Sequence, residues 1–218
     1  MTECVIACST LKGELGLAFA RLGREWPVRW VPSGYHDFPK KLHALLQEEL
    51  DNVQADRVLM AFGLCGNAVS GLQSRDFELI LPRTDDCISM LIGSVQARAD
   101  YGREHAAYYL TQGWLSGERN IWTEYQYTRQ KYGDEQADAI LKMMFGHYRT
   151  LGLLDTGAYP MEDLYRQSAP IAEAFGFAQE TVPAGIGWLE NLLTGPWPEA
   201  RFIRLAPNRT MTGDLLLL

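Results

Sequence analysis

The stretch that decides the fold is residues 57–67, RVLMAFGLCGN. Residues 57–62 form a short apolar run, which predicts a buried strand. Residues 63–67 place glycines on both sides of Cys65 and predict a tight turn. A buried strand that ends in a glycine-rich turn is typical of a parallel sheet covered by helices.

The same alternation continues on both sides of this stretch. Residues 4–8 and 28–31 predict two further strands, and residues 77–81 predict a fourth. Residues 39–53 place one apolar stripe on a predicted helix that begins at Pro39. The fold class is therefore predicted to be α/β, with a Rossmann-like, mostly parallel sheet flanked by helices.

The middle of the chain has a different pattern. Residues 87–110, 117–132 and 134–148 predict aromatic-rich helices, and the strand pattern then resumes at 150–154, 180–182 and 201–205. We therefore expect a single α/β domain over residues 1–218, with sheet elements in 1–92 and 149–218 and a helical insertion at about 93–148. This insertion could cover a crevice or form a dimer surface, so a homo-oligomer stays open.

Composition excludes several classes of partner. The 218 residues include 20 Lys and Arg against 27 Asp and Glu, a net charge of −7. Because the sequence has no block or stripe of Lys and Arg, the chain is not expected to bind nucleic acid or acidic lipid. Its apolar runs are too short for a membrane span, and its first residues lack the pattern of a signal peptide. We expect a cytoplasmic protein.

Three thiols and one imidazole follow predicted strands directly. Cys8 ends the first strand, His36 follows the second, Cys65 the third and Cys87 the fourth. Ligands of open parallel sheets bind at the carboxyl ends of the strands, because the loops converge there. Cys4 lies about 13 Å from Cys8 along an extended strand and is expected in the core.

These side chains suit a soft metal. Cys8, Cys65 and Cys87 with His36 would complete a tetrahedral zinc site, and the three thiolates alone could hold an iron–sulfur cluster with one open iron. Two alternatives stay open. The cysteines could simply be buried near the strand ends, or Cys65 could be a metal-free nucleophile whose pKa is lowered by a following helix.

Other residues at this edge are candidates for substrate chemistry. His36 and Asp86 are predicted to act as acid–base groups, although Asp86 precedes a predicted helix and could cap it. For neighbouring Asp85, capping is the favoured role. The predicted substrate-binding residues come from the turns and the aromatic segment: Asn67, Arg83, Tyr108, Tyr109 and Trp114.

Seven short stretches along the chain carry a family resemblance. They are residues 7–11 (ACSTL), 36–42 (HDFPKKL), 62–67 (FGLCGN), 82–87 (PRTDDC), 108–114 (YYLTQGW), 195–197 (GPW) and 201–203 (RFI). Together they resemble the bacterial and archaeal family called domain of unknown function 1638. The family label names no reaction, and the resemblance implies an association with corrinoid methyl-transfer systems. Phe38, Phe62 and Gln112 depart from the family pattern.

The predicted function is a metal- or iron–sulfur-cluster-binding protein that acts on a small molecule in one-carbon, corrinoid or sulfur-related metabolism. The alternative is a non-catalytic metal or cofactor carrier that serves a corrinoid methyltransferase system. An open ligand position beside a cavity lined by Tyr108 and Trp114 would favour catalysis, whereas a closed four-ligand site would favour the carrier.

Overall fold

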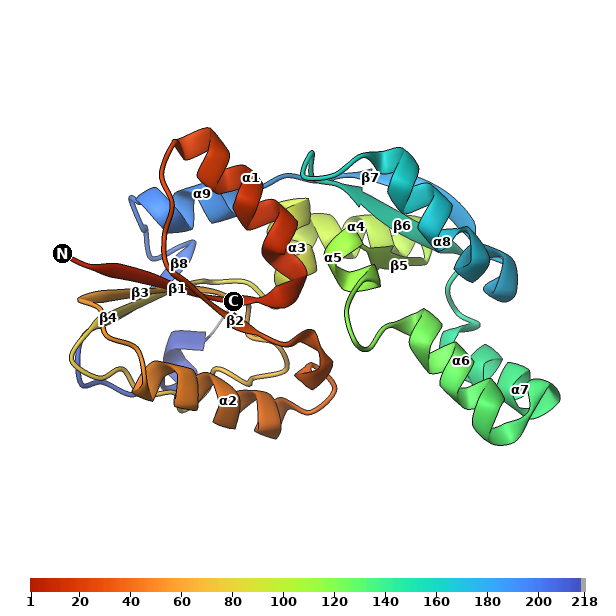
Figure 1. The fold of residues 1–218 in the computed structure, drawn as a ribbon, viewed down its shortest axis with the longest axis horizontal. Helices are drawn as coiled ribbons and strands as arrows, with labels where there is room; N and C mark the ends of the chain where they lie inside the picture. The colour runs from red at the N-terminus through yellow and green to blue at the C-terminus, as the bar shows by residue number, and fades with distance from the viewer. Residues whose placement is uncertain (217–218) are drawn as a thin grey trace.

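A computed structural model describes residues 1–216 and contains two β-sheets with helices packed against them (Figure 1). The first sheet has the strand order β2-β1-β3-β4-β8. Strands β1 to β4 run parallel, and β8 pairs with β4 in the antiparallel sense. The strands are β1 (Glu3–Cys8), β2 (Val28–Val31), β3 (Arg57–Ala61), β4 (Glu78–Pro82) and β8 (Phe202–Leu205).

Both faces of this sheet are buried, which explains the continuous apolar runs of its strands. Along β1, Val5 and Ala7 face helices α1 (Lys12–Leu22) and α9 (Gly187–Thr194). Ile6 and Cys8 face the opposite side, where α2 (Pro39–Asp51) packs through Leu42, Leu46 and Leu50. The predicted α/β class, the four parallel strands and the helix that begins at Pro39 are confirmed.

The second sheet is smaller and parallel, with the order β5-β6-β7. Its strands are β5 (Ala107–Leu110), β6 (Thr150–Asp155) and β7 (Ala178–Pro183), and α8 (Met161–Phe175) packs on it. Leu110, Leu151 and Leu153 share a core with Leu164 and Ile171 of α8. We call the region built around this sheet, residues 107–183, the second part of the molecule. Helices α6 (Ile121–Tyr132) and α7 (Asp134–Phe145) form a hairpin at its far end (Figure 1).

The segment predicted as one helix over residues 87–110 is instead two helices and a strand. Helix α3 (Cys87–Ile92) ends at Gly93, whose φ is 113°, and α4 (Val95–His105) begins after Ser94, whose side chain accepts a hydrogen bond from the Ala97 N–H. Strand β5 follows. A short apolar run such as residues 107–110 cannot be told from a helical turn by periodicity alone. The later strands β6 and β7 therefore pair with β5 and do not extend the first sheet.

The chain crosses between the two sheets twice, at adjacent points. The Gly185 N–H donates to the Leu91 carbonyl over 2.8 Å, and Trp188 Nε1 donates to the Gly93 carbonyl over 2.9 Å. A third contact is made by helix α5 (Gln112–Leu115), which packs on the short 3₁₀ segment Ser9–Leu11 after β1. A Cβ atom at Gly113 would lie 1.9 Å from the Thr10 carbonyl oxygen, so only glycine allows this approach.

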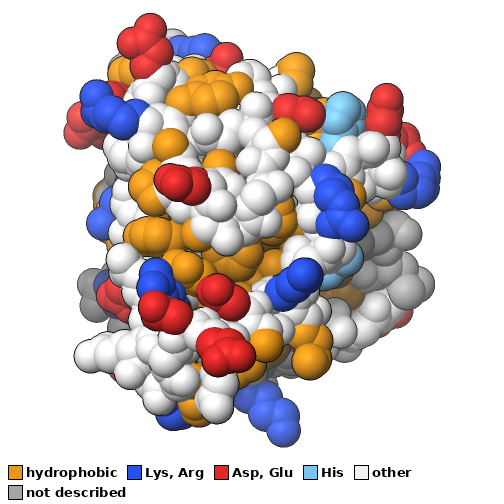
Figure 2. Space-filling view, turned by 90° about the vertical axis from the view of Figure 1, so that its right-hand side faces the viewer, with side chains coloured by type: hydrophobic (Ala, Val, Ile, Leu, Met, Phe, Trp, Pro, Cys, Tyr) orange, Lys and Arg blue, Asp and Glu red, His pale blue; other side chains and the backbone are white. Residues whose placement is uncertain are grey.

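The outer face of the second part mixes apolar side chains with charges of both signs (Figure 2). Apolar side chains exposed on the α6–α7 hairpin include Tyr127, Met143 and Met144. Among residues 1–216 no helix is both long and apolar enough to cross a membrane.

Candidate functional site

Two loops at the carboxyl edge of the first sheet are joined backbone to backbone. The Leu64 N–H donates to the Thr84 carbonyl and the Cys65 N–H to the Asp85 carbonyl, each over 2.8 Å. A Cβ at Gly63 would lie 2.6 Å from the backbone of Asp86. The glycine that suggested a tight turn is thus required by a close approach, which brings the loops of Cys65 and Cys87 together.

The end of β1 and the segment after β2 bring a third thiol and the imidazole to this edge. Cys8 Sγ lies 3.3 Å from His36 Nε2 and accepts a hydrogen bond from Thr10 Oγ1 over 3.1 Å. The His36 ring meets the Trp114 ring edge to face, with 5.3 Å between centroids. A side chain of the second part of the molecule therefore holds the imidazole against the first sheet.

A cavity of about 450 Å³, which we call the thiol cavity, lies between the two sheets at this point. The first sheet contributes His36, Cys65 and Cys87, while the second part contributes Tyr108, Tyr109 and Trp114. Cys8 is buried and adjoins the cavity through its contact with His36. The structure thus brings the predicted thiols, the imidazole and the three predicted aromatic residues to one place.

The environment keeps these groups neutral. Burial raises the pKa of the Cys8, Cys65 and Cys87 thiols. The mutual proximity of the thiols and the charge of Asp86 raise the pKa values of Cys65 and Cys87 further. Burial lowers the pKa of His36, against the opposing effect of Asp37 and Asp86. A thiol cluster of this kind would favour a positively charged ligand.

The prediction that a following helix lowers the pKa of Cys65 is wrong. Residues 65–71 form turns, and Cys65 itself has a φ of 45°. Because no helix begins after Cys65 in this part of the described chain, no helix dipole offsets the burial of its thiol. The pKa is raised, which removes the feature that favoured a metal-free nucleophile.

Asp86 is tied into the structure by three contacts. Its Oδ1 accepts from the Ser89 N–H over 2.9 Å at the start of α3, and its Oδ2 pairs with Arg98 Nη1 of α4. Asp85 Oδ1 accepts from the Asp86 N–H, and Asp85 Oδ2 lies 3.3 Å from Arg98. The residue that caps α3 is therefore Asp86 and not Asp85, the one favoured from sequence. Both carboxylates still line the cavity.

Two of the predicted substrate-binding residues lie elsewhere. Arg83 donates from Nε to the Glu199 carbonyl over 2.8 Å and from Nη1 to the Leu215 carbonyl over 2.7 Å, so it fastens the C-terminal segment. Asn67 is exposed and borders a separate hollow beside Pro39 and His43. Position after a strand did not suffice to locate them, because it does not fix the direction of a side chain within a turn.

Arg98 and Tyr148 also line the thiol cavity and were not predicted. Arg98 is on α4, where the sequence shows an exposed polar helix with no distinguishing motif. Tyr148 follows α7 and packs edge to face with Tyr108, with centroids 5.5 Å apart. The aromatic density of the segment was the one available signal for Tyr148, and no local signal pointed to Arg98.

As they stand, the side chains of residues 1–216 include no group of three or more His, Cys, Asp or Glu that could hold a metal ion. The donor types nevertheless suit a soft metal, because thiolate and imidazole are its preferred ligands. Coordination would require these donor atoms to come closer together than they lie here.

Comparison with known proteins places the chain in a family. The family model described as "Protein of unknown function (DUF1638)" matches residues 30–193, most of the chain, including His36, Cys65 and Cys87. No curated protein and no solved structure matches the chain.

Proposed function

We propose that this chain, which belongs to the family of proteins of unknown function DUF1638, binds a metal and acts on a small molecule. Cys8, Cys65 and Cys87 would hold a zinc ion or an iron–sulfur cluster, with His36 as a further ligand of zinc or as a neighbouring acid–base group. The observation that carries the proposal is the convergence of three buried thiols and one imidazole on one cavity edge.

The electrostatics of the thiol cluster support a cationic occupant. Each of the three thiols has a raised pKa; Cys8 contributes to the raised pKa of both Cys65 and Cys87, and Cys65 contributes to that of Cys87. A bound metal reverses this balance because it stabilises thiolates and drives their protons off. In the described part of the chain, Arg98 is the cation that lines this cavity, and it is already paired with Asp85 and Asp86.

The cavity supports action on a small molecule over the carrier alternative. Tyr108, Tyr109 and Trp114 give it apolar walls beside the thiols, with space left for a ligand. A zinc ion or an open iron would supply a Lewis acid there. His36, whose pKa is lowered by burial, would be the neutral base near neutral pH, and the Asp86 carboxylate would hold Arg98 in the wall. A place in one-carbon, corrinoid or sulfur metabolism stays a prediction from the family resemblance.

Metal content measured without oxygen tests the proposal. The native chain, a Cys8→Ser/Cys65→Ser/Cys87→Ser variant and a Cys4→Ser control are purified in parallel. Cys4 is also buried, but it lies at the other end of β1 and its Sγ contacts the Val5 carbonyl. We expect near-stoichiometric zinc, or iron with sulfide and a visible absorption band, in the native and control proteins. The triple variant should contain neither.

Circular dichroism and thermal unfolding of each preparation show whether the triple variant is folded. If it does not fold, single Cys65→Ser and Cys87→Ser variants replace it. Native protein that stays free of metal after expression in medium supplied with iron and zinc, and after reconstitution, would overturn the proposal. Equal metal in the native protein and a folded triple variant would do the same.

A further inference from the structure

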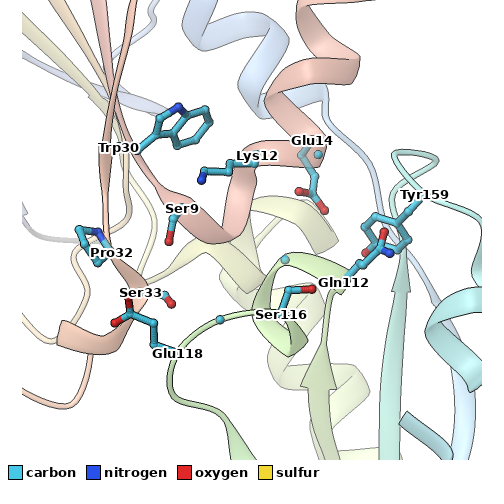
Figure 3. Close-up of a pocket in the computed structure, with 13 residues that line it drawn as sticks. Ser9, Lys12, Glu14, Trp30, Pro32, Ser33, Gln112, Ser116, Glu118 and Tyr159 are labelled. Carbon is cyan, nitrogen blue, oxygen red and sulfur yellow. The ribbon is translucent and has the colours of Figure 1, made fainter. Parts of the chain in front are cut away.

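A second cavity, of about 490 Å³, lies on the other side of helix α5 (Figure 3). Ser9 lines it from the 3₁₀ segment after β1, Lys12 and Glu14 from the beginning of α1, and Trp30 from β2. Gln112 of α5 and Ser116, the residue that ends α5, line it as well. Its walls come from the same two parts of the molecule as the thiol cavity. Cysteine is absent from its described lining, which includes the polar side chains of Ser9, Gln112 and Ser116.

Glu14 is the unusual member of this wall. Its side chain is fully buried, at 0% exposure, and Oε1 is the acceptor of a 3.3 Å hydrogen bond from Thr156 Oγ1. Oε2 is the one buried side-chain N or O atom in residues 1–216 without a hydrogen-bond partner. Figure 3 shows the carboxylate pointing from α1 into the space toward Gln112 and Ser116. A buried acceptor without a partner is costly, and native proteins rarely retain one without a reason.

We propose that this cavity binds a small protonated amine, whose ammonium group donates a hydrogen bond to Glu14 Oε2. The inference concerns a site separate from the thiol cavity and does not depend on metal binding there. An ammonium group supplies the two things that Oε2 lacks, which are a hydrogen-bond donor and a compensating positive charge.

The other charges of the wall favour a cation over an anion. Lys12 Nζ is directed toward the Trp30 ring, 5.5 Å from its centroid, on the far side of the cavity from Glu14 (Figure 3). Glu118 adds a second carboxylate at the exposed rim. With Glu14 ionised, these three side chains sum to one net negative charge, which repels a carboxylate or phosphate. Trp30 and the Tyr159 ring offer apolar surface for the carbon skeleton of the amine.

The hydroxyl of Tyr159 does not compete for the ligand. It donates to the Leu154 carbonyl over 2.7 Å, which fixes the ring as a wall. Glu14 is therefore the lining residue with a buried hydrogen-bonding atom that has no partner, and it is the residue to change.

Titration of ¹⁵N-labelled protein with n-butylamine, n-butanol and butyrate tests the proposal. The three probes share a chain length and differ in charge. We expect butylamine to shift the Trp30 indole and Gln112 amide signals at saturable concentrations, with butanol and butyrate at least about tenfold weaker. A Glu14→Gln variant should bind butylamine at least about tenfold more weakly, whereas an exposed Glu25→Gln control should match the native chain.

Several outcomes would overturn the inference: no saturable shift with butylamine, equal shifts with butyrate, unchanged affinity in Glu14→Gln, or shifts confined to Trp114 in the thiol cavity. The titration is repeated with the Cys8→Ser/Cys65→Ser/Cys87→Ser variant or its folded single-site replacements. Retained amine binding there, whatever the metal result, separates this inference from the proposed metal function.

Discussion

The cavities on the two sides of helix α5 are built from the same loops but differ in chemistry. The last residue of β1, Cys8, adjoins one cavity and the next residue, Ser9, lines the other, while the segment after β2 gives His36 to one and Ser33 to the other. Trp114 of helix α5 lines the thiol cavity. Gln112 and Ser116 line the second cavity, which we call the carboxyl cavity after Glu14. Neighbouring residues on one scaffold therefore produce one site with sulfur donors and another with a carboxylate oxygen, each beside aromatic rings.

Burial acts in the same direction in both cavities. It raises the pKa of the Cys65 and Cys87 thiols on one side and of the Glu14 carboxyl on the other. In either site, a ligand that brings positive charge would offset this cost of ionisation. The donor atom decides which ligand that is, since sulfur prefers a soft metal and a carboxylate oxygen prefers an ammonium donor.

A Gly113→Ala substitution should damage both cavities and have the largest effect on stability. The added Cβ would meet the Thr10 carbonyl oxygen at 1.9 Å, so α5 would have to move away from the first sheet. We expect a loss of about 3 kcal/mol in the free energy of unfolding by urea, the upper part of the range for overpacking. The matched control is Gly16→Ala in α1, where nothing lies within 4 Å and a gain of about 0.5–1 kcal/mol is expected. Equal effects of the two substitutions would contradict this view of the contact.

A Glu14→Gln substitution should change only the carboxyl cavity and should stabilise the protein in alkaline solution. The pKa of Glu14 is raised above its ordinary 4.5 by burial. For an acid with a raised pKa in the folded state, the stability it contributes is present below the unfolded value and is lost as pH rises. We expect the variant to be more stable by about 1–2 kcal/mol at pH 8, with the difference disappearing toward pH 4.

Urea unfolding at both pH values measures this difference, with Glu25→Gln as the exposed control. A native protein that is the more stable one at pH 8 would show that Glu14 already has a compensating partner.

An Asp86→Asn substitution should change only the thiol cavity, and by the smallest amount. Asparagine keeps the cap on α3, because its side-chain oxygen can accept from the Ser89 N–H. It removes the negative charge that raises the pKa values of Cys65 and Cys87 and leaves Arg98 with one carboxylate partner fewer. We expect the pKa values of these two thiols to fall.

The measurement is the rate of alkylation by iodoacetamide against pH, in protein stripped of metal. The profile should move to lower pH in the variant, while the profile of Cys4, whose raised pKa has no contribution from Asp86, stays in place. A profile unchanged at Cys65 and Cys87 would remove Asp86 from the electrostatics of the site.

Much of the fold could be predicted because its signals are local. Residues 28–31 as a strand and Pro39 as the first residue of a helix follow from apolar runs, periodicity and proline geometry. The split at Gly93 and the strand at 107–110 could not, since a four-residue apolar run fits a helix and a strand equally well. Pairing of β6 with β5, and not with the first sheet, depends on that missed strand.

The candidate sites divide in the same way. Cys65 and Cys87 were placed at the sheet edge by strand counting, because parallel strands end on one side. Arg83 and Asn67 were placed there by the same rule, yet side-chain direction puts them on other surfaces. Glu14 had a sequence signal that went unused, a charged residue within the helical stripe of Leu11, Leu15 and Ala18.

The sequence by itself determined the α/β class, the buried strands and the gathering of thiols at one edge, because periodicity and chain order control these features. Only the tertiary structure decided that a second sheet closes over that edge, that Gly113 permits the contact, and that Glu14 is buried beside an open space. Those features depend on the approach of segments far apart in the chain, and the packing that joins them has no local pattern.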